Sequence, residues 1–156
     1  MRDSAAACNI IVSPNTNLVV KYGIRLTNAN ATLSTTGGKI SYIQNTKFNA
    51  ADLGKINSDG TSFEFSMYGV GLQGPFRLTP NSTIKNLKTD ITLNNNANWD
   101  HINIDESITI RDSLILNRGR VFVNNGYTLN LASTATVIGG NTGSFVEGVL
   151  QRSGNT

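Results

Sequence analysis

The chain has 156 residues and a net charge of +3, and 38% of its residues are hydrophobic, which is enough for one domain with its own core. Charged residues make up 15% of the chain, against about 25% in typical soluble proteins. The basic residues are scattered and form no stripe with interleaved aromatic side chains, so we expect no nucleic-acid partner. No apolar run approaches the ~18 residues of a membrane span, and we expect no such span.

Residues 9–43 predict a series of short strands separated by turns. The apolar segments alternate with turn residues such as Ser13-Pro14-Asn15 and Gly37-Gly38. The expected strands are 9–12, 17–20, 24–26, 31–33 and 39–43. Residues 44–75 are less regular. We interpret them as a loop excursion, with a brief helix or a loop at 48–56 and one short strand at 63–65.

Residues 91–138 repeat a short pattern in which apolar residues at alternate positions are followed by a few polar ones. Such alternation is the period of a strand with one buried face. The apolar positions are Ile91/Leu93, Ile102/Ile104, Ile108/Ile110, Leu114/Leu116, Val121/Val123, Leu129/Leu131 and Val137. The expected strands follow one another too closely for helices to lie between them, so the pattern predicts an all-β fold.

An offset of about 21–23 residues places these apolar positions over one another, with three strands in each repeat. The expected neighbours are Ile91/Leu93 with Leu114/Leu116, Leu114 with Val137, Ile102 with Val123, and Ile108/Ile110 with Leu129/Leu131. This layout predicts a right-handed, three-sided parallel β-helix, a solenoid in which each coil is buried only by its neighbours.

The alternative fold is a β-sandwich, for which Asn125-Gly126 and Asp59-Gly60 offer hairpin turns. On either interpretation we expect residues 1–156 to form a single domain. In the solenoid interpretation, we expect it to be a fragment of a longer chain.

Residues 108–152 contain strand segments, an Asn-Gly turn at 125–126, a Leu-x-Leu strand at 129–131, a Gly-Gly turn at 139–140 and the phrase Ser-Phe-Val-Glu-Gly at 144–148. This succession resembles a recurrent passage in large secreted cell-surface proteins of Bacteroidetes, which usually carry a C-terminal sorting domain. The resemblance implies a β-solenoid segment that is exported to the cell surface. It also implies an adhesive or matrix role more often than a defined reaction.

The densest group of acid–base side chains consists of Asp100, His101, Asp105, Glu106 and Asp112. Paired carboxylates could hydrolyse a sugar or hold a calcium ion. Their spacing argues against both, because Asp105 and Glu106 fall at one expected corner and Asp112 at the next. We therefore expect no catalytic residues, no metal site and no cofactor, and we expect that the protein is not an enzyme.

Trp99, Asp100 and His101 form the candidate ligand site, because an exposed indole stacks well on a pyranose ring. The alternative is that Trp99 only covers one side of the solenoid while Asp100 and His101 are solvated.

From these observations we expect a structural or adhesive module of an extracellular bacterial surface protein. It would be a stiff, polar rod that spaces other modules or self-associates into filaments through open strand edges. Expected partners are further copies or neighbouring modules, with glycans as a further candidate. Two alternatives remain open, namely a polysaccharide-binding or polysaccharide-cleaving β-helix, and a segment of a phage tail fibre or spike.

Overall fold

The computed structural model describes residues 8–9, 12–44, 51–67, 75–92 and 101–154, and these residues form strands but no helix. The strands are β1 (Cys8–Asn9), β2 (Asn17–Val20), β3 (Thr32–Thr36), β4 (Lys39–Gln44), β5 (Lys55–Met67), β6 (Thr83–Asp90), β7 (His101–Ile104), β8 (Ile108–Arg118), β9 (Arg120–Val123), β10 (Leu129–Leu131), β11 (Thr136–Gly139), β12 (Val146–Glu147) and β13 (Leu150–Arg152). Within these ranges no helix is long and apolar enough to cross a membrane.

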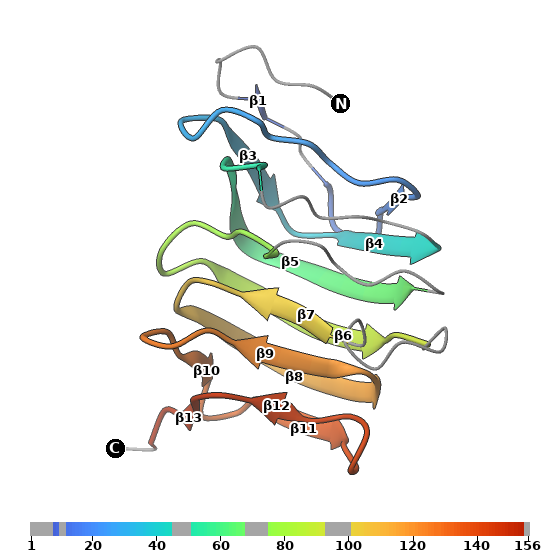
Figure 1. Cartoon of the computed structure of the whole chain (residues 1–156), viewed down its shortest axis with the longest axis vertical. Coiled ribbons are helices and arrows are strands. Elements are labelled where there is room, and N and C mark those ends of the chain that lie inside the picture. Colours follow the sequence, from blue (N-terminus) through green and yellow to red (C-terminus); the bar gives the residue numbers. More distant parts are fainter. Residues whose placement is uncertain (1–7, 10–11, 45–50, 68–74, 93–100, 155–156) are drawn as a thin grey trace.

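The strands stack in parallel as a β-solenoid of about five turns, as the sequence predicted. A ten-stranded sheet runs from β1 to β13 and bends to cover two sides, and a three-stranded sheet of β7, β9 and β12 forms the third. In Figure 1 the chain descends from β1 at the top to β13 at the bottom. Strands β6 and β8 run to the right at the back of the molecule, and β7 and β9 run to the left at the front. This is the right-handed sense that parallel crossovers prefer.

Alternation along each strand decides which side chains face the core. In β9, Val121 and Val123 are buried while the residues before them are only partly buried, which is the period-2 pattern of one covered face. The pattern resets where a strand bends between two sides. In β8 this happens at Arg111 and Asp112, which are both exposed, between the buried pairs Ile108/Ile110 and Leu114/Leu116.

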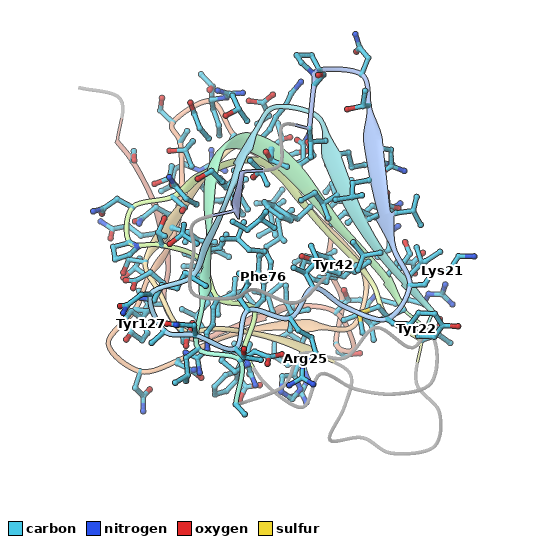
Figure 2. All side chains as sticks on the ribbon, turned by 90° about the horizontal axis from the view of Figure 1, so that it is seen from above. Lys21, Tyr22, Arg25, Tyr42, Phe76 and Tyr127 are labelled. Atoms are coloured by element: carbon cyan, nitrogen blue, oxygen red, sulfur yellow. The ribbon has the colours of Figure 1, made fainter. Side chains whose placement is uncertain are left out.

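An aromatic cluster fills the centre of the N-terminal half. Tyr42 stacks on Phe65 with ring centroids 5.1 Å apart, and the edge of Phe76 meets Phe63 at 5.0 Å. These rings come from three successive passes of the chain, so they hold neighbouring coils in register. Figure 2 shows Tyr42 and Phe76 inside the coil, whereas Tyr22 lies outside at a corner.

The parallel pairing rules out the β-sandwich alternative. All named strand pairs are parallel, and among the described residues the antiparallel contact is an isolated bridge between Asn141 and Ser144. Neither expected hairpin turn joins antiparallel strands. Asn125-Gly126 connects β9 to β10 on different sides of the solenoid, and Asp59-Gly60 lies within β5.

Three local predictions from the N-terminal part can be compared with the structure. The range 44–75 was expected to be a loop excursion, but it contains β5, whose inward residues Phe63, Phe65 and Met67 alternate regularly. At 48–56, where a brief helix or a loop was expected, residues 51–54 are not helical and residues 55–56 belong to β5; residues 45–50 lie outside the described residues. Residues 24–26 form no strand, although Leu26 is buried.

The expected register holds for two sets of strand partners and fails for two others. Ile108/Ile110 pair with Leu129/Leu131, and Leu114 pairs with Val137, as predicted. However, Ile102 pairs with Val121 and not with Val123. Leu114 and Leu116 lie beside Leu87 and Thr89, in place of the expected Ile91 and Leu93; Leu93 itself lies outside the described residues. The reason is that coil length varies, because strand partners in neighbouring coils are 19 positions apart at Ile102 and Val121 and 27 positions apart at Leu87 and Leu114.

Candidate functional site

The predicted glycan contact can be followed at one residue. His101 begins β7, and Trp99 and Asp100 lie outside the described residues. The side chain of His101 is partly buried and faces away from the core, because the next residue, Ile102, faces inward. Its ring lies 6.0 Å from that of Phe122 in the following coil. The described part of this candidate site is therefore a packing contact on the outer face of the third side.

The predicted acidic group is divided among separate partners. Asp105 pairs with Arg77, and Glu106 pairs with Lys55 at 3.4 Å, at the corner that follows β7. Asp112 lies at the bend within β8, where its carboxylate accepts a hydrogen bond from Arg111 Nε at 3.2 Å. No three His, Cys, Asp or Glu side chains of the described ranges gather closely enough to hold a metal ion.

One corner carries a ladder of alternating charges that we call the Asp52 ladder, formed by Arg25, Asp52, Arg77 and Asp105. Arg25 Nη2 lies 2.9 Å from Asp52 Oδ1, and Arg77 Nε donates to the backbone oxygen of Asp52 at 2.9 Å. Arg77 then reaches Asp105 in the next coil. The hydrogen bond and charge of Asp52 raise the pKa of Arg25. Burial raises the pKa of Asp105 more than the neighbouring cations Arg77 and Lys55 lower it.

A second set, the Glu64 ladder, consists of Lys39, Glu64 and Lys88 on the adjoining side. Glu64 accepts hydrogen bonds from Lys39 at 2.9 Å and from Lys88 at 2.6 Å, and Ser66 donates a third. Partial burial by itself would raise the pKa of Glu64. The three hydrogen bonds, with that from Lys88 the strongest, outweigh burial and lower the pKa to about 2.

Further pairs join the coils near the C-terminal end. Arg118 Nε lies 2.6 Å from Asp90, and Arg120 Nη1 lies 2.9 Å from Glu147. Sequence reasoning missed these pairs and both ladders. The signal that could have revealed them is the recurrence of opposite charges 24 to 28 positions apart, which is the length of one coil.

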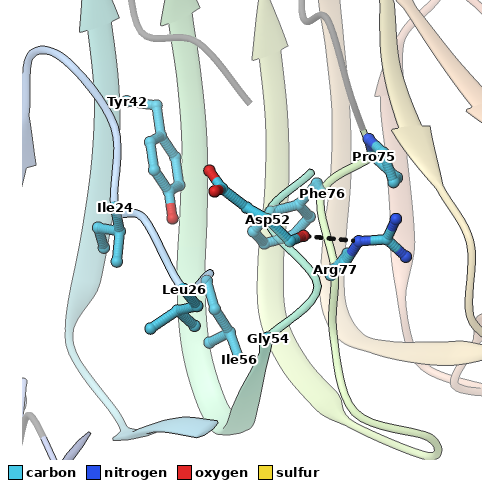
Figure 3. A pocket seen from close by; sticks show the side chains of 9 residues that line it. All are labelled: Ile24, Leu26, Tyr42, Asp52, Gly54, Ile56, Pro75, Phe76 and Arg77. Carbon is cyan, nitrogen blue, oxygen red and sulfur yellow. Dashed lines mark hydrogen bonds between the residues drawn. The ribbon is translucent and has the colours of Figure 1, made fainter. Parts of the chain in front are cut away.

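A small cavity lies under the Asp52 ladder (Figure 3). Tyr42 and Phe76 line it from the core, and Asp52, Gly54 and Arg77 line it from the corner. Its volume of about 30 Å³ is enough for a water molecule or two. It is far below the roughly 300 Å³ at which small-molecule pockets begin. It is therefore a packing gap at a polar corner and not a substrate pocket.

The last coil, which we call the terminal coil, contains β11, β12 and β13 and exposes apolar side chains. Val137 and Leu150 are 44% and 42% exposed, although they lie over Leu114 and Leu129, which are fully buried. The other large apolar side chains exposed on this coil are Ile138, Phe145 and Val149. Among the described residues each of the three strands is paired along one edge only, with β8, β9 or β10. The terminal coil thus presents both apolar surface and unpaired backbone groups.

Three comparisons give no match. No family model, curated protein or solved structure matches this chain.

Proposed function

We propose that this chain is a structural module of an extracellular bacterial surface protein, a stiff rod that spaces other modules and extends by stacking of further coils. The observation that carries the proposal is the terminal coil. Its inward-facing Val137 and Leu150 have the register of core residues, but no coil among the described residues covers them. Apolar side chains in that position, next to unpaired strand edges, favour association with another parallel coil.

The side surfaces support a mechanical role over a catalytic one. The carboxylates of the Asp52 and Glu64 ladders are each paired with a cation, and most of these pairs join neighbouring coils. Such pairs connect coils along the axis in addition to the backbone bonds of the parallel sheet. Because each coil contacts only its neighbours, added links between coils resist bending and fraying.

We propose that the partner of the terminal coil is a second copy of this chain. The bent sheet begins at β1 and β2 and ends at β11 and β13, and all its named strands run in the same direction. Strand β11 of one copy can therefore pair in parallel with β2 of the next. Val137 would then face Leu18, which points inward in β2. Head-to-tail contacts of this kind do not close into rings and produce filaments.

The test is light scattering with negative-stain imaging of the purified chain over a concentration series. We expect rods that lengthen with concentration, and shorter or no rods for the double variant Val137→Lys/Leu150→Lys. Leu53→Lys is the matched control, since Leu53 is equally exposed, at 47%, but lies away from the terminal coil. A wild-type chain that stays monomeric at every concentration would refute the self-association. A compact trimer would favour the tail-fibre alternative.

A further inference from the structure

A groove follows the bend between the first two sides of the solenoid and crosses several coils. Its volume is about 430 Å³, within the roughly 300–1,000 Å³ of sites that hold small ligands. Gly37, Gly38 and Gly60 form part of its wall, and Lys85 and Arg111 line it in the following coils. We call it the bend groove.

The bend groove exists because glycines occupy the bend in successive coils. Gly37, Gly38 and Gly60 have φ values of 66°, 62° and 69°, in the left-handed region where other residues are strained. A Cβ at Gly60 would lie 3.3 Å from Nη2 of Arg111, so the guanidinium lies directly over this glycine. The strand pairing also shifts register between β5 and β6 and between β6 and β8 here. Such bulges often occur beside functional sites.

Two cations of the bend groove differ from those of the ladders. Lys85 Nζ has its closest carboxylate, Asp112, at 4.0 Å, beyond hydrogen-bond distance. Arg111 donates to Asp112 through Nε. Its Nη1 and Nη2 have no hydrogen-bond acceptor in the described structure. Both side chains are about half exposed, at 49% and 51%. Two positive groups from neighbouring coils are thus available to a ligand in the same hollow.

The charges around the groove leave a small positive excess. Lys39 and Lys88 share Glu64, and Asp112 lies between Lys85 and Arg111. Asp59, which precedes Gly60, is exposed. Of these charged residues, Lys39, Lys85 and Arg111 line the groove itself, and none of the carboxylates is among its described lining residues. The excess favours an anionic ligand but is too small for tight binding of a bare polyanion, so other contacts must contribute.

The remaining lining is polar and uncharged. Asn15, Thr16, Asn17 and Ser62 contribute amide and hydroxyl groups, and none of the described residues that line the groove is aromatic. Amides and hydroxyls hydrogen-bond to sugar hydroxyls. A single-stranded nucleic acid would instead require aromatic side chains on which its bases could stack.

We propose that the bend groove binds an acidic polysaccharide, with a uronate carboxylate held by Arg111 and Lys85. The planar guanidinium offers two free nitrogens, which suits bidentate contact with a carboxylate. The sugar hydroxyls lie against Asn15, Thr16 and Ser62. Because the groove runs across coils, the polysaccharide lies along the solenoid axis. This site does not depend on association through the terminal coil.

The experiment measures binding of a fluorescent uronate hexasaccharide to the intact chain at low and physiological salt. The methyl ester of the same hexasaccharide is the uncharged control probe. The test variant is Lys85→Gln/Arg111→Gln, and the control variant is Arg118→Gln/Arg120→Gln, which removes the same charge at another corner. Circular dichroism before each titration confirms that the variants are folded, and the half-exposed positions of Lys85 and Arg111 favour this.

We expect the wild-type chain and the control variant to bind the uronate, and the test variant to bind it roughly tenfold more weakly or not at all. We also expect the methyl ester to bind weakly and affinity to fall as salt rises. No binding by the wild-type chain, equal binding of the methyl ester, or unchanged binding by the test variant would overturn the proposal. Tighter binding of a single-stranded deoxythymidine hexamer than of the uronate would also overturn it.

Discussion

Leu150 lies directly over Leu129 in the parallel stack, yet Leu150 is 42% exposed and Leu129 is fully buried. The two side chains have the same chemistry and point in the same direction within their coils. They differ in that Leu129 has a coil on both sides. Burial in this fold therefore depends on position along the axis as much as on the alternation within a strand.

Truncation of these two leucines should have different effects on stability. We expect Leu129→Ala to lower the free energy of unfolding by about 2–5 kcal/mol, because it leaves a cavity between two coils. Leu150→Ala should lower it by about 1 kcal/mol or less, because that side chain is partly in water. Urea denaturation followed by circular dichroism measures both at a concentration where the chain is monomeric. Equal losses would contradict an uncovered terminal coil.

Two buried threonines offer a second comparison. Thr61 donates a hydrogen bond to Thr35 at 3.1 Å, whereas the hydroxyl of Thr89 has no hydrogen-bond partner in the described structure. Valine has almost the same shape as threonine without the hydroxyl. We expect Thr89→Val to stabilise the fold by about 1 kcal/mol, because it removes an unsatisfied polar group. Thr61→Val should destabilise it by a similar amount.

Thermal unfolding of the two valine variants beside the wild-type chain checks this prediction. A higher melting temperature for Thr89→Val and a lower one for Thr61→Val is the expected result. If both variants shift in the same direction, hydrogen bonding is not what distinguishes these positions.

The Glu64 ladder should make stability depend on pH in the acid range. The pKa of Glu64 in the folded chain is about 2, below its ordinary value of 4.5. The unfolded chain therefore binds the proton more readily, and stability falls as pH decreases from about 4.5 to about 2. At neutral pH we expect Glu64→Gln to cost about 1 kcal/mol, since solvent screens this partly exposed cluster.

The measurement is urea unfolding of the wild-type chain and Glu64→Gln between neutral pH and pH 2. The difference between them should shrink as pH falls through this window. Asp59→Asn is the control, because Asp59 is an exposed carboxylate outside the ladder. A difference that stays constant down to pH 2 would show that the lysines do not hold Glu64 ionised.

The sequence predicted the fold because strand alternation is local and strong. The segments at 108–110 and 129–131 have the same alternating pattern, and their pairing was predicted correctly. The pairing of Ile102 was displaced by two residues, because the connection between β8 and β9 is shorter than elsewhere. Register in a solenoid depends on corner lengths, which alternation does not report.

The candidate site was harder to predict, for a physical reason. The bend groove depends on where glycines and long cations fall at the same bend in successive coils. Gly60 and Arg111 become neighbours only when the bulges at this bend are taken into account. The glycan contact at Trp99, Asp100 and His101 was instead predicted from residue types that are adjacent in the sequence. The described member of this group, His101, packs against Phe122.

The Asp52 ladder also determines how many coils must be copied together if such a solenoid is to lengthen by duplication of its coils. Its charges alternate in sign from coil to coil, in the order Arg25, Asp52, Arg77 and Asp105. Copying a single coil would place two like charges in adjacent coils at this corner, whereas copying two adjacent coils would keep opposite charges in adjacent coils. At this corner the electrostatic repeat is therefore twice as long as the structural repeat.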